Sequence, residues 1–126
     1  MGEHTDGRGR VVLLGVGDPP GTGVRLTRGG VTAVADVVDR PDRFSAVGAA
    51  TLDALTQLIP PVATFTVEDV HLITGERPVV VMVISIVIGG LPILHVGSAL
   101  VRDDPDTAAA KATLCAVNRR LDILGV

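Results

Sequence analysis

The feature that most constrains this chain is a long apolar run, Val79 to Val101, which is broken in its middle by Gly89-Gly90. Its length would suit a membrane-spanning helix, which needs about 20 apolar residues. However, a Gly-Gly pair between two Val- and Ile-rich segments is typical of a hairpin turn, and Pro92 disfavours a helix. We therefore expect two antiparallel strands, Val79–Ile88 and Leu91–Val101, and no membrane span.

The first of these strands is apolar on both faces, with Ser85 as its single polar residue. A strand with one face in water should alternate apolar and polar side chains. Helices can cover one face only, so the second face needs another cover, and we predict a homodimer or larger oligomer. A bound apolar ligand is the alternative cover. The predicted interface residues are Val79, Val80, Val81, Met82, Val83, Ile84, Ile86 and Ile88. Val79, Val81 and Val83 should face one layer, and Val80, Met82 and Ile84 the other.

Two segments have helical spacing and helix-boundary residues. Asp39 is a predicted N-cap, and Pro60-Pro61 stops a helix that we expect over Asp39–Ile59. Asp104 is the predicted N-cap of a second helix, Pro105–Leu124, which Gly125 ends.

The other apolar segments are predicted strands. They cover Val11–Leu14, a hairpin of Val24–Arg28 and Val31–Val38, and Val62–Thr74 with a bulge near Glu68-Asp69. The expected fold is α+β, a two-layer sandwich in which two helices cover one face of a mainly antiparallel sheet, in the order ββαβββα. The 126 residues fit a flexible N-terminal tail over residues 1–10 and a single domain over 11–126.

Composition argues against several function classes. A net charge of −3 and an aromatic content of 2% disfavour nucleic-acid binding, which needs basic patches and stacking aromatic rings. Cys115 is the only cysteine, so no intramolecular disulfide can form. The first residues lack a basic region followed by an apolar run, so we expect no secretory signal and a cytoplasmic protein.

No complete catalytic motif is present. The glycines between Gly15 and Gly23 precede a predicted strand, whereas a phosphate loop needs a helix there. His71 and His95 lack the spacing of metal ligands, and His95 and Ser98 should lie on opposite faces of a strand. Asp103, Asp104 and Asp106 fit helix capping, and Cys115 fits a packed thiol. We expect no metal, no bound nucleotide and no other cofactor, and we favour a non-enzymatic protein over an enzyme.

The segments Val96-Gly97-Ser98 and Ala108–Asn118 resemble the C-terminal regulatory domain of 2-isopropylmalate synthase and its relatives. In that family a strand with Val-Gly-Ser and a loop precede a helix of the type A-S-x-x-A-L-x-D-A-I-N. Here Ala108, Ala112, Ala116, Val117 and Asn118 match that helix. Ala109 and Cys115 replace its Ser and Asp. The family's catalytic barrel has no counterpart. The resemblance implies a free-standing regulatory or dimerisation module.

Three hypotheses remain open. The first is a non-enzymatic module that self-associates through its sheet and binds a small molecule, with His71, His95, Gly97 and Ser98 as candidate ligand-binding residues. The second is a small oligomeric enzyme with an active site between subunits. The third is a structural or adaptor subunit for a protein partner.

Overall fold

The computed structural model describes residues 10–17, 23–37 and 42–125. A first sheet contains β1 (Val12–Val16), β2 (Gly23–Arg28) and β3 (Val31–Asp36), and α1 (Arg43–Thr56) follows it. A second sheet contains β4 (Thr64–Ile73), β5 (Val79–Ile88) and β6 (Leu91–Leu100), and α2 (Pro105–Leu124) ends the fold. Nearly all of the predicted N-terminal tail and the predicted cap Asp39 lie outside the described residues.

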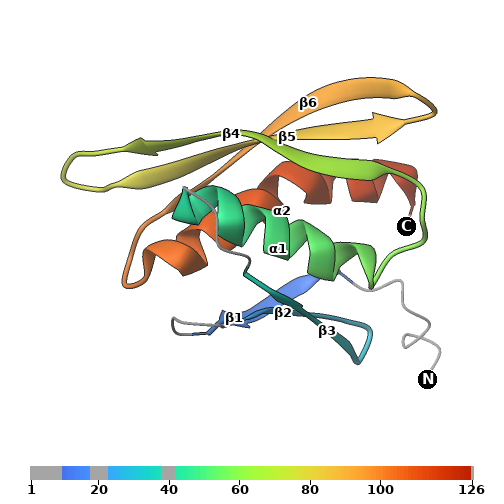
Figure 1. Ribbon diagram of the computed structural model, residues 1–126, viewed down its shortest axis with the longest axis horizontal. Coiled ribbons are helices and arrows are strands. Elements are labelled where there is room, and N and C mark those ends of the chain that lie inside the picture. The colour runs from blue at the N-terminus through green and yellow to red at the C-terminus, as the bar shows by residue number, and fades with distance from the viewer. Residues whose placement is uncertain (1–9, 18–22, 38–41, 126) are drawn as a thin grey trace.

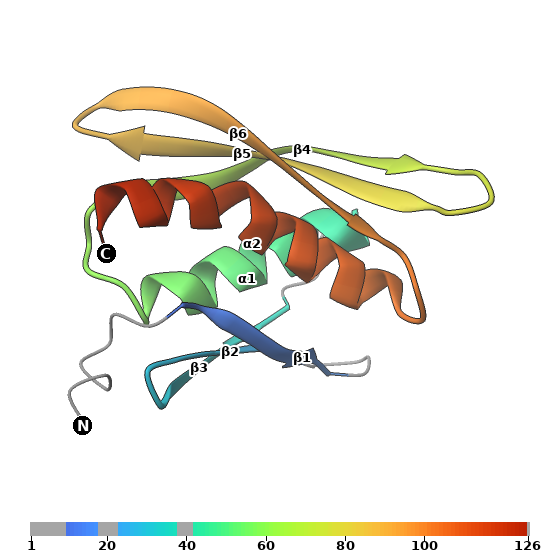
Figure 2. The ribbon, with the colours of Figure 1, turned by 180° about the vertical axis from the view of Figure 1, so that it is seen from behind.

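The two helices lie side by side between the two sheets (Figures 1 and 2). The α+β class, the antiparallel pairing and the ββαβββα order, extended by β1, are confirmed. Both helices cover one face of the second sheet, as predicted. The prediction of a single sheet was wrong, because β1, β2 and β3 pair with one another and cover the opposite side of the helices. Val24 and Leu26 of β2 are fully buried there.

The second helix has the predicted boundaries. The Asp104 side chain accepts hydrogen bonds from the Asp106 backbone N–H (3.1 Å) and the Thr107 hydroxyl (2.8 Å). Gly125 ends the helix at φ 72°, a left-handed conformation that glycine adopts without strain. The capping interpretation of Asp104 is therefore confirmed.

The first helix is shorter than predicted. Asp42, placed by the sequence in the first turn, is the N-cap, and its carboxylate accepts from the Phe44 backbone N–H at 3.0 Å. The helix ends at Thr56, before the predicted end at Ile59. Leu58 then forms a tight turn by donating its N–H to the Leu55 carbonyl, so Pro60-Pro61 follows a helix that has already ended.

The predicted apolar hairpin is confirmed, with β5 at Val79–Ile88 and β6 ending one residue early at Leu100. Gly89 and Gly90 form its turn with φ 59° and 83°, the double positive φ of a tight hairpin. The bulge in β4 is also confirmed, between Val67 and Asp69. The strand predicted over Val11–Leu14 extends further along the chain, because β1 includes Gly15 and Val16 and continues through a bulge of its own.

The chain is a repeat of two βββα units, a relation that sequence analysis missed. The first unit runs from β1 to α1 and the second from β4 to α2. The caps Asp42 and Asp104, and the segments Ala50–Leu52 and Ala112–Leu114, both Ala-Thr-Leu, are separated by the same number of residues. Thr51 and Thr113 are both fully buried, and each hydroxyl donates to the carbonyl four residues earlier, at 2.7 and 2.8 Å.

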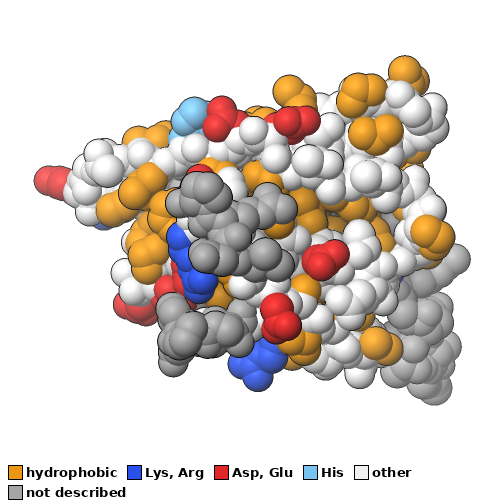
Figure 3. Space-filling view, in the orientation of Figure 1, with side chains coloured by type: hydrophobic (Ala, Val, Ile, Leu, Met, Phe, Trp, Pro, Cys, Tyr) orange, Lys and Arg blue, Asp and Glu red, His pale blue; other side chains and the backbone are white. Residues whose placement is uncertain are grey.

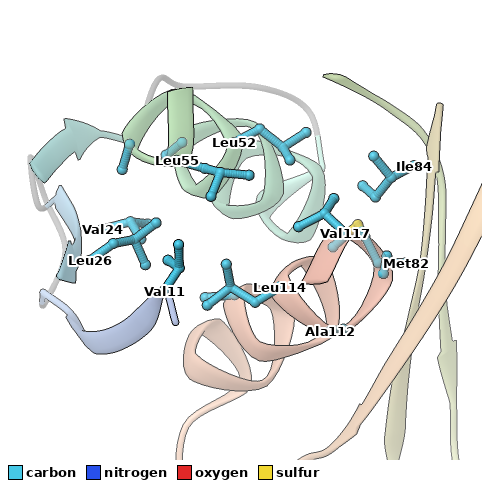
Figure 4. Packing of buried hydrophobic residues seen from close by; sticks show 14 of the residues in the cluster. Val11, Val24, Leu26, Leu52, Leu55, Met82, Ile84, Ala112, Leu114 and Val117 are labelled. Carbon is cyan, nitrogen blue, oxygen red and sulfur yellow. The ribbon is translucent and has the colours of Figure 1, made fainter. Parts of the chain in front are cut away.

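The hydrophobic core fills the space between the layers. Leu55 and Leu114 of the helices lie toward Val24 and Leu26 on one side, and Val117 lies beside Met82 and Ile84 of the second sheet on the other (Figure 4). An ion pair links the helix N-termini, with Arg43 Nη2 2.8 Å from Asp106 Oδ2 and Arg43 Nε 3.3 Å from Asp106 Oδ1. Within the described ranges, neither helix is long and apolar enough to cross a membrane.

Candidate functional site

The most distinctive surface is the outer face of the second sheet, the face turned away from the helices. The pairing register places one set of β5 side chains on this face and the other set against the helices. Val80, Met82, Ile84 and Ile86 are fully buried in the core, so these four are removed from the predicted interface. Ile88 also points to the helix side. The predicted alternation of the two sets is confirmed.

An apolar stripe crosses this outer face along β5 and β6. Its members are aligned by the strand register: Val79, Val81, Val83 and Val87 of β5, Leu94, Val96 and Leu100 of β6, and Ile73 of β4. Leu94 is 62% exposed and Val96 is 64% exposed. Hydrophobic side chains project along the upper right of Figure 3, over the β5–β6 hairpin. No charged side chain occupies the β5 and β6 positions of this face.

The β4 edge of the same face is polar. Thr64, Thr66, Asp69 and His71 lie opposite Val87, Ser85, Val83 and Val81. His71 Nε2 is 2.9 Å from Asp69 Oδ2, and both side chains are 59% exposed. An apolar centre with a polar border is the arrangement of protein interfaces.

The four candidate ligand-binding residues do not form one site. His71 and Ser98 flank Val81 on the outer face, whereas His95 and Gly97 point toward the helices. His95 is held by two hydrogen bonds: its Nε2 accepts from Arg120 Nε at 3.2 Å, and its Nδ1 lies 3.3 Å from the Ile93 carbonyl. Because arginine can only donate, Nε2 is the unprotonated nitrogen.

Gly97 has a packing role. A Cβ atom placed on it would lie 2.1 Å from the Ala112 carbonyl oxygen and 2.3 Å from the Ala116 backbone nitrogen. The backbone of α2 therefore rests directly on β6, and no space for a ligand remains at this point. The small residues of Val96–Ser98 and Ala108–Asn118 meet each other at this contact.

Two open grooves occupy equivalent places in the two units. The acidic groove, about 280 Å³, lies between α1 and β4 and is lined by Asp36 and Asp53 together with Ala49, Thr56 and Phe65. The basic groove, about 650 Å³, lies between α2 and β1. Its lining includes Arg10, Lys111 and Arg119, with Val11, Val12, Leu13, Leu114, Cys115, Asn118 and Asp122. Cys115 is exposed in this groove, so its prediction as a packed thiol was wrong.

Sequence reasoning missed both grooves because each combines segments that are distant in the chain. A signal was available for the helical part: Lys111, Cys115, Asn118 and Asp122 recur at helical spacing on the polar side of α2. The position of β1 beside them could not be read from that spacing.

The other candidate chemistries find little support in the described part of the chain. There, no three His, Cys, Asp or Glu side chains gather as metal ligands. Gly23 is the first residue of β2, so a strand and not the helix that a phosphate loop requires follows the glycine-rich segment.

Comparisons with known proteins identify no relative. No protein-family profile, curated protein or solved structure matches this chain.

Proposed function

We propose that this protein is a non-enzymatic module that self-associates through the outer face of its second sheet. The observation that carries the proposal is the uncovered apolar stripe on β5 and β6. In the isolated chain this stripe would remain in water, whereas Val80, Met82, Ile84 and Ile86 on the opposite face of β5 are fully buried. Contiguous apolar patches of this kind mark interaction surfaces.

The outer face of the first sheet provides a comparison within the same molecule. Its outer face carries Arg25, Thr27 and Thr32 among three exposed valine and leucine side chains, Val12, Leu14 and Val34. That mixture is ordinary for a sheet face in water. The two sheets have the same strand order and the same relation to the helices, so the fold itself does not require an apolar outer face.

A second copy of the chain is the occupant that fits best. The stripe lacks charges, and a two-fold axis would place it against an identical stripe, with the polar β4 edges at the border. Ten-residue strands are about 33 Å long, and three strands at about 4.8 Å spacing give roughly 500 Å² in projection. Side chains that project from the sheet make its accessible area larger than this projected area. The face therefore approaches the ~800 Å² that each partner contributes to a standard interface.

The energetics also favour association. Fully burying a Val or Leu side chain contributes about 1.5–3 kcal/mol. The stripe holds five Val, two Leu and one Ile. The four β5 valines are already partly buried and gain less than this. Burial of the whole set is of the same order as the ~4–15 kcal/mol of translational and rotational freedom lost on association. We further propose a regulatory role, which rests only on the resemblance of Val96–Ser98 and Ala108–Asn118 to the regulatory domain of 2-isopropylmalate synthase.

The test compares three aspartate substitutions by light scattering and circular dichroism. Val81→Asp puts a charge on the stripe and should give a folded monomer. Met82→Asp puts a charge in the core and should prevent folding. Thr32→Asp, on the outer face of the first sheet, is the matched control and should leave both fold and assembly unchanged.

Two outcomes would overturn the proposal. One is a soluble, folded, monomeric natural chain at micromolar concentration. The other is a Val81→Asp protein that assembles as the natural chain does. The first outcome would leave a different protein partner as the cover of the stripe, which is the adaptor hypothesis.

A further inference from the structure

The basic groove is separate from the proposed interface and carries its own chemistry. It lies between α2 and β1, whereas the apolar stripe lies on the far side of the second sheet. Three of the eleven basic residues of an acidic chain gather around it: Arg10, Lys111 and Arg119. All three are exposed, and no ion pair joins them to a side chain in the described part of the structure.

The equivalent groove shows that the fold does not require these cations. The counterparts of Lys111, Cys115 and Asn118 in α1 are Ala49, Asp53 and Thr56, and these line the acidic groove. The helix forms and packs in both cases. The concentration of positive charge is therefore a property of this one groove, and mutual repulsion among its cations is an unfavourable term that a bound anion would remove.

The lining defines the ligand further. Val11 and Leu114 are buried hydrophobic residues at the base of the groove, and Asn118 adds an amide that can donate and accept hydrogen bonds. Asp122 offsets one of the three positive charges, which leaves an excess of two. A volume of about 650 Å³ is in the range of small-molecule sites.

We infer that the basic groove binds a small organic dianion, a phosphate monoester or a dicarboxylate, that carries a short apolar body. The anionic head lies among Arg10, Lys111 and Arg119. The apolar body lies against Val11 and Leu114. Binding requires no covalent step and is independent of the proposed self-association.

The experiment uses the full chain and four probes of equal chain length: hexyl phosphate, hexylmalonate, hexanol and hexylamine. Isothermal titration at about pH 8, where a phosphate monoester is a dianion, measures affinity. We expect both dianions to bind, hexanol and hexylamine not to bind, and the stronger dianion to identify the head group. The rate of Cys115 alkylation shows whether the ligand occupies the basic groove, because a dianion bound there should slow the reaction.

Lys111→Ala gives α2 the residue that α1 has at the equivalent position, Ala49. This change should weaken dianion binding about tenfold, equivalent to ~1.4 kcal/mol. Lys111→Glu with Arg119→Glu should abolish binding. Arg102→Ala, an exposed arginine outside the groove, is the control and should bind as the natural chain does. Circular dichroism verifies that each variant is folded.

Three results would overturn the inference: equal binding of hexanol or hexylamine, dianion affinity unchanged by charge reversal in a folded variant, or no dianion binding at millimolar concentration. Light scattering of Val81→Asp separates this inference from the proposed function, because a monomer should keep its dianion affinity.

Discussion

The two βββα units share an element order, similar hairpin turns and equivalent buried threonines, yet they present different surfaces to the outside. The outer face of the first sheet mixes charged, polar and apolar side chains, whereas the β5–β6 part of the second carries no charge and is apolar except for Ser85 and Ser98. The grooves differ in the same way, with aspartates in one and cations in the other. Positions fixed by packing between the layers are alike in the two units. Positions on the outer sheet faces and in the grooves, which do not face this packing, differ between the two units. We therefore look for function at these positions.

The largest effect is expected at the contact between Gly97 and α2. Gly97→Ala places a Cβ within 2.3 Å of helix backbone atoms, which cannot rotate away. We expect a loss of about 3 kcal/mol or more in the free energy of unfolding, at the upper end of overpacking effects. Urea denaturation measures it. A loss below about 1 kcal/mol would show that α2 can move off β6 at little cost.

The buried threonines test whether the units are energetically equivalent. Thr51→Val and Thr113→Val each remove one hydroxyl that donates to a helix carbonyl. We expect similar losses of about 1 kcal/mol, the net contribution of one hydrogen bond. Thermal unfolding of the two variants and of the double variant provides the measurement. Clearly unequal losses would mean that the repeat in sequence is not a repeat in packing.

The ion pair between Arg43 and Asp106 has no equivalent, because the matching positions hold Pro105 and Phe44. The Arg43 side chain is 41% exposed and Asp106 is 14% exposed, so solvent weakens their attraction. A double-mutant cycle with Arg43→Ala and Asp106→Ala should give a coupling energy below about 1 kcal/mol. The coupling should decrease in high salt, and salt independence would contradict an electrostatic origin.

The smallest effect is expected at Gly48, whose counterpart in α2 is Ala110. A Cβ at Gly48 would lie 3.1 Å from Met82 Cε and 3.2 Å from Val67 Cγ2. Met82 is flexible and can give way, and alanine favours the helix by about 1 kcal/mol over glycine. We expect Gly48→Ala to change stability by less than about 0.5 kcal/mol. A loss of stability as large as that of Gly97→Ala would show that the side chains of Met82 and Val67 cannot move aside for the added Cβ.

Several elements could be predicted from the sequence because their signals are local. Asp104, Pro105 and Gly125 determine both ends of α2 through hydrogen bonds and backbone conformations within a few residues. Gly89-Gly90 determines the β5–β6 turn in the same way, and the change of phase in Val62–Thr74 reveals the β4 bulge. The two apolar faces of β5 were also evident, since side chains alternate along any strand.

Only the tertiary structure decided which face of β5 lies in the core, that the first three strands form a sheet of their own, and that β1 closes a groove against α2. Each depends on contacts between residues far apart in the chain, where local propensity gives no direction. Val80 and Val81 are the same amino acid in adjacent positions, yet one is fully buried in the core and the other lies on the outer face. Their difference arises from the helices and from Gly97, which lets α2 rest on one side of the sheet.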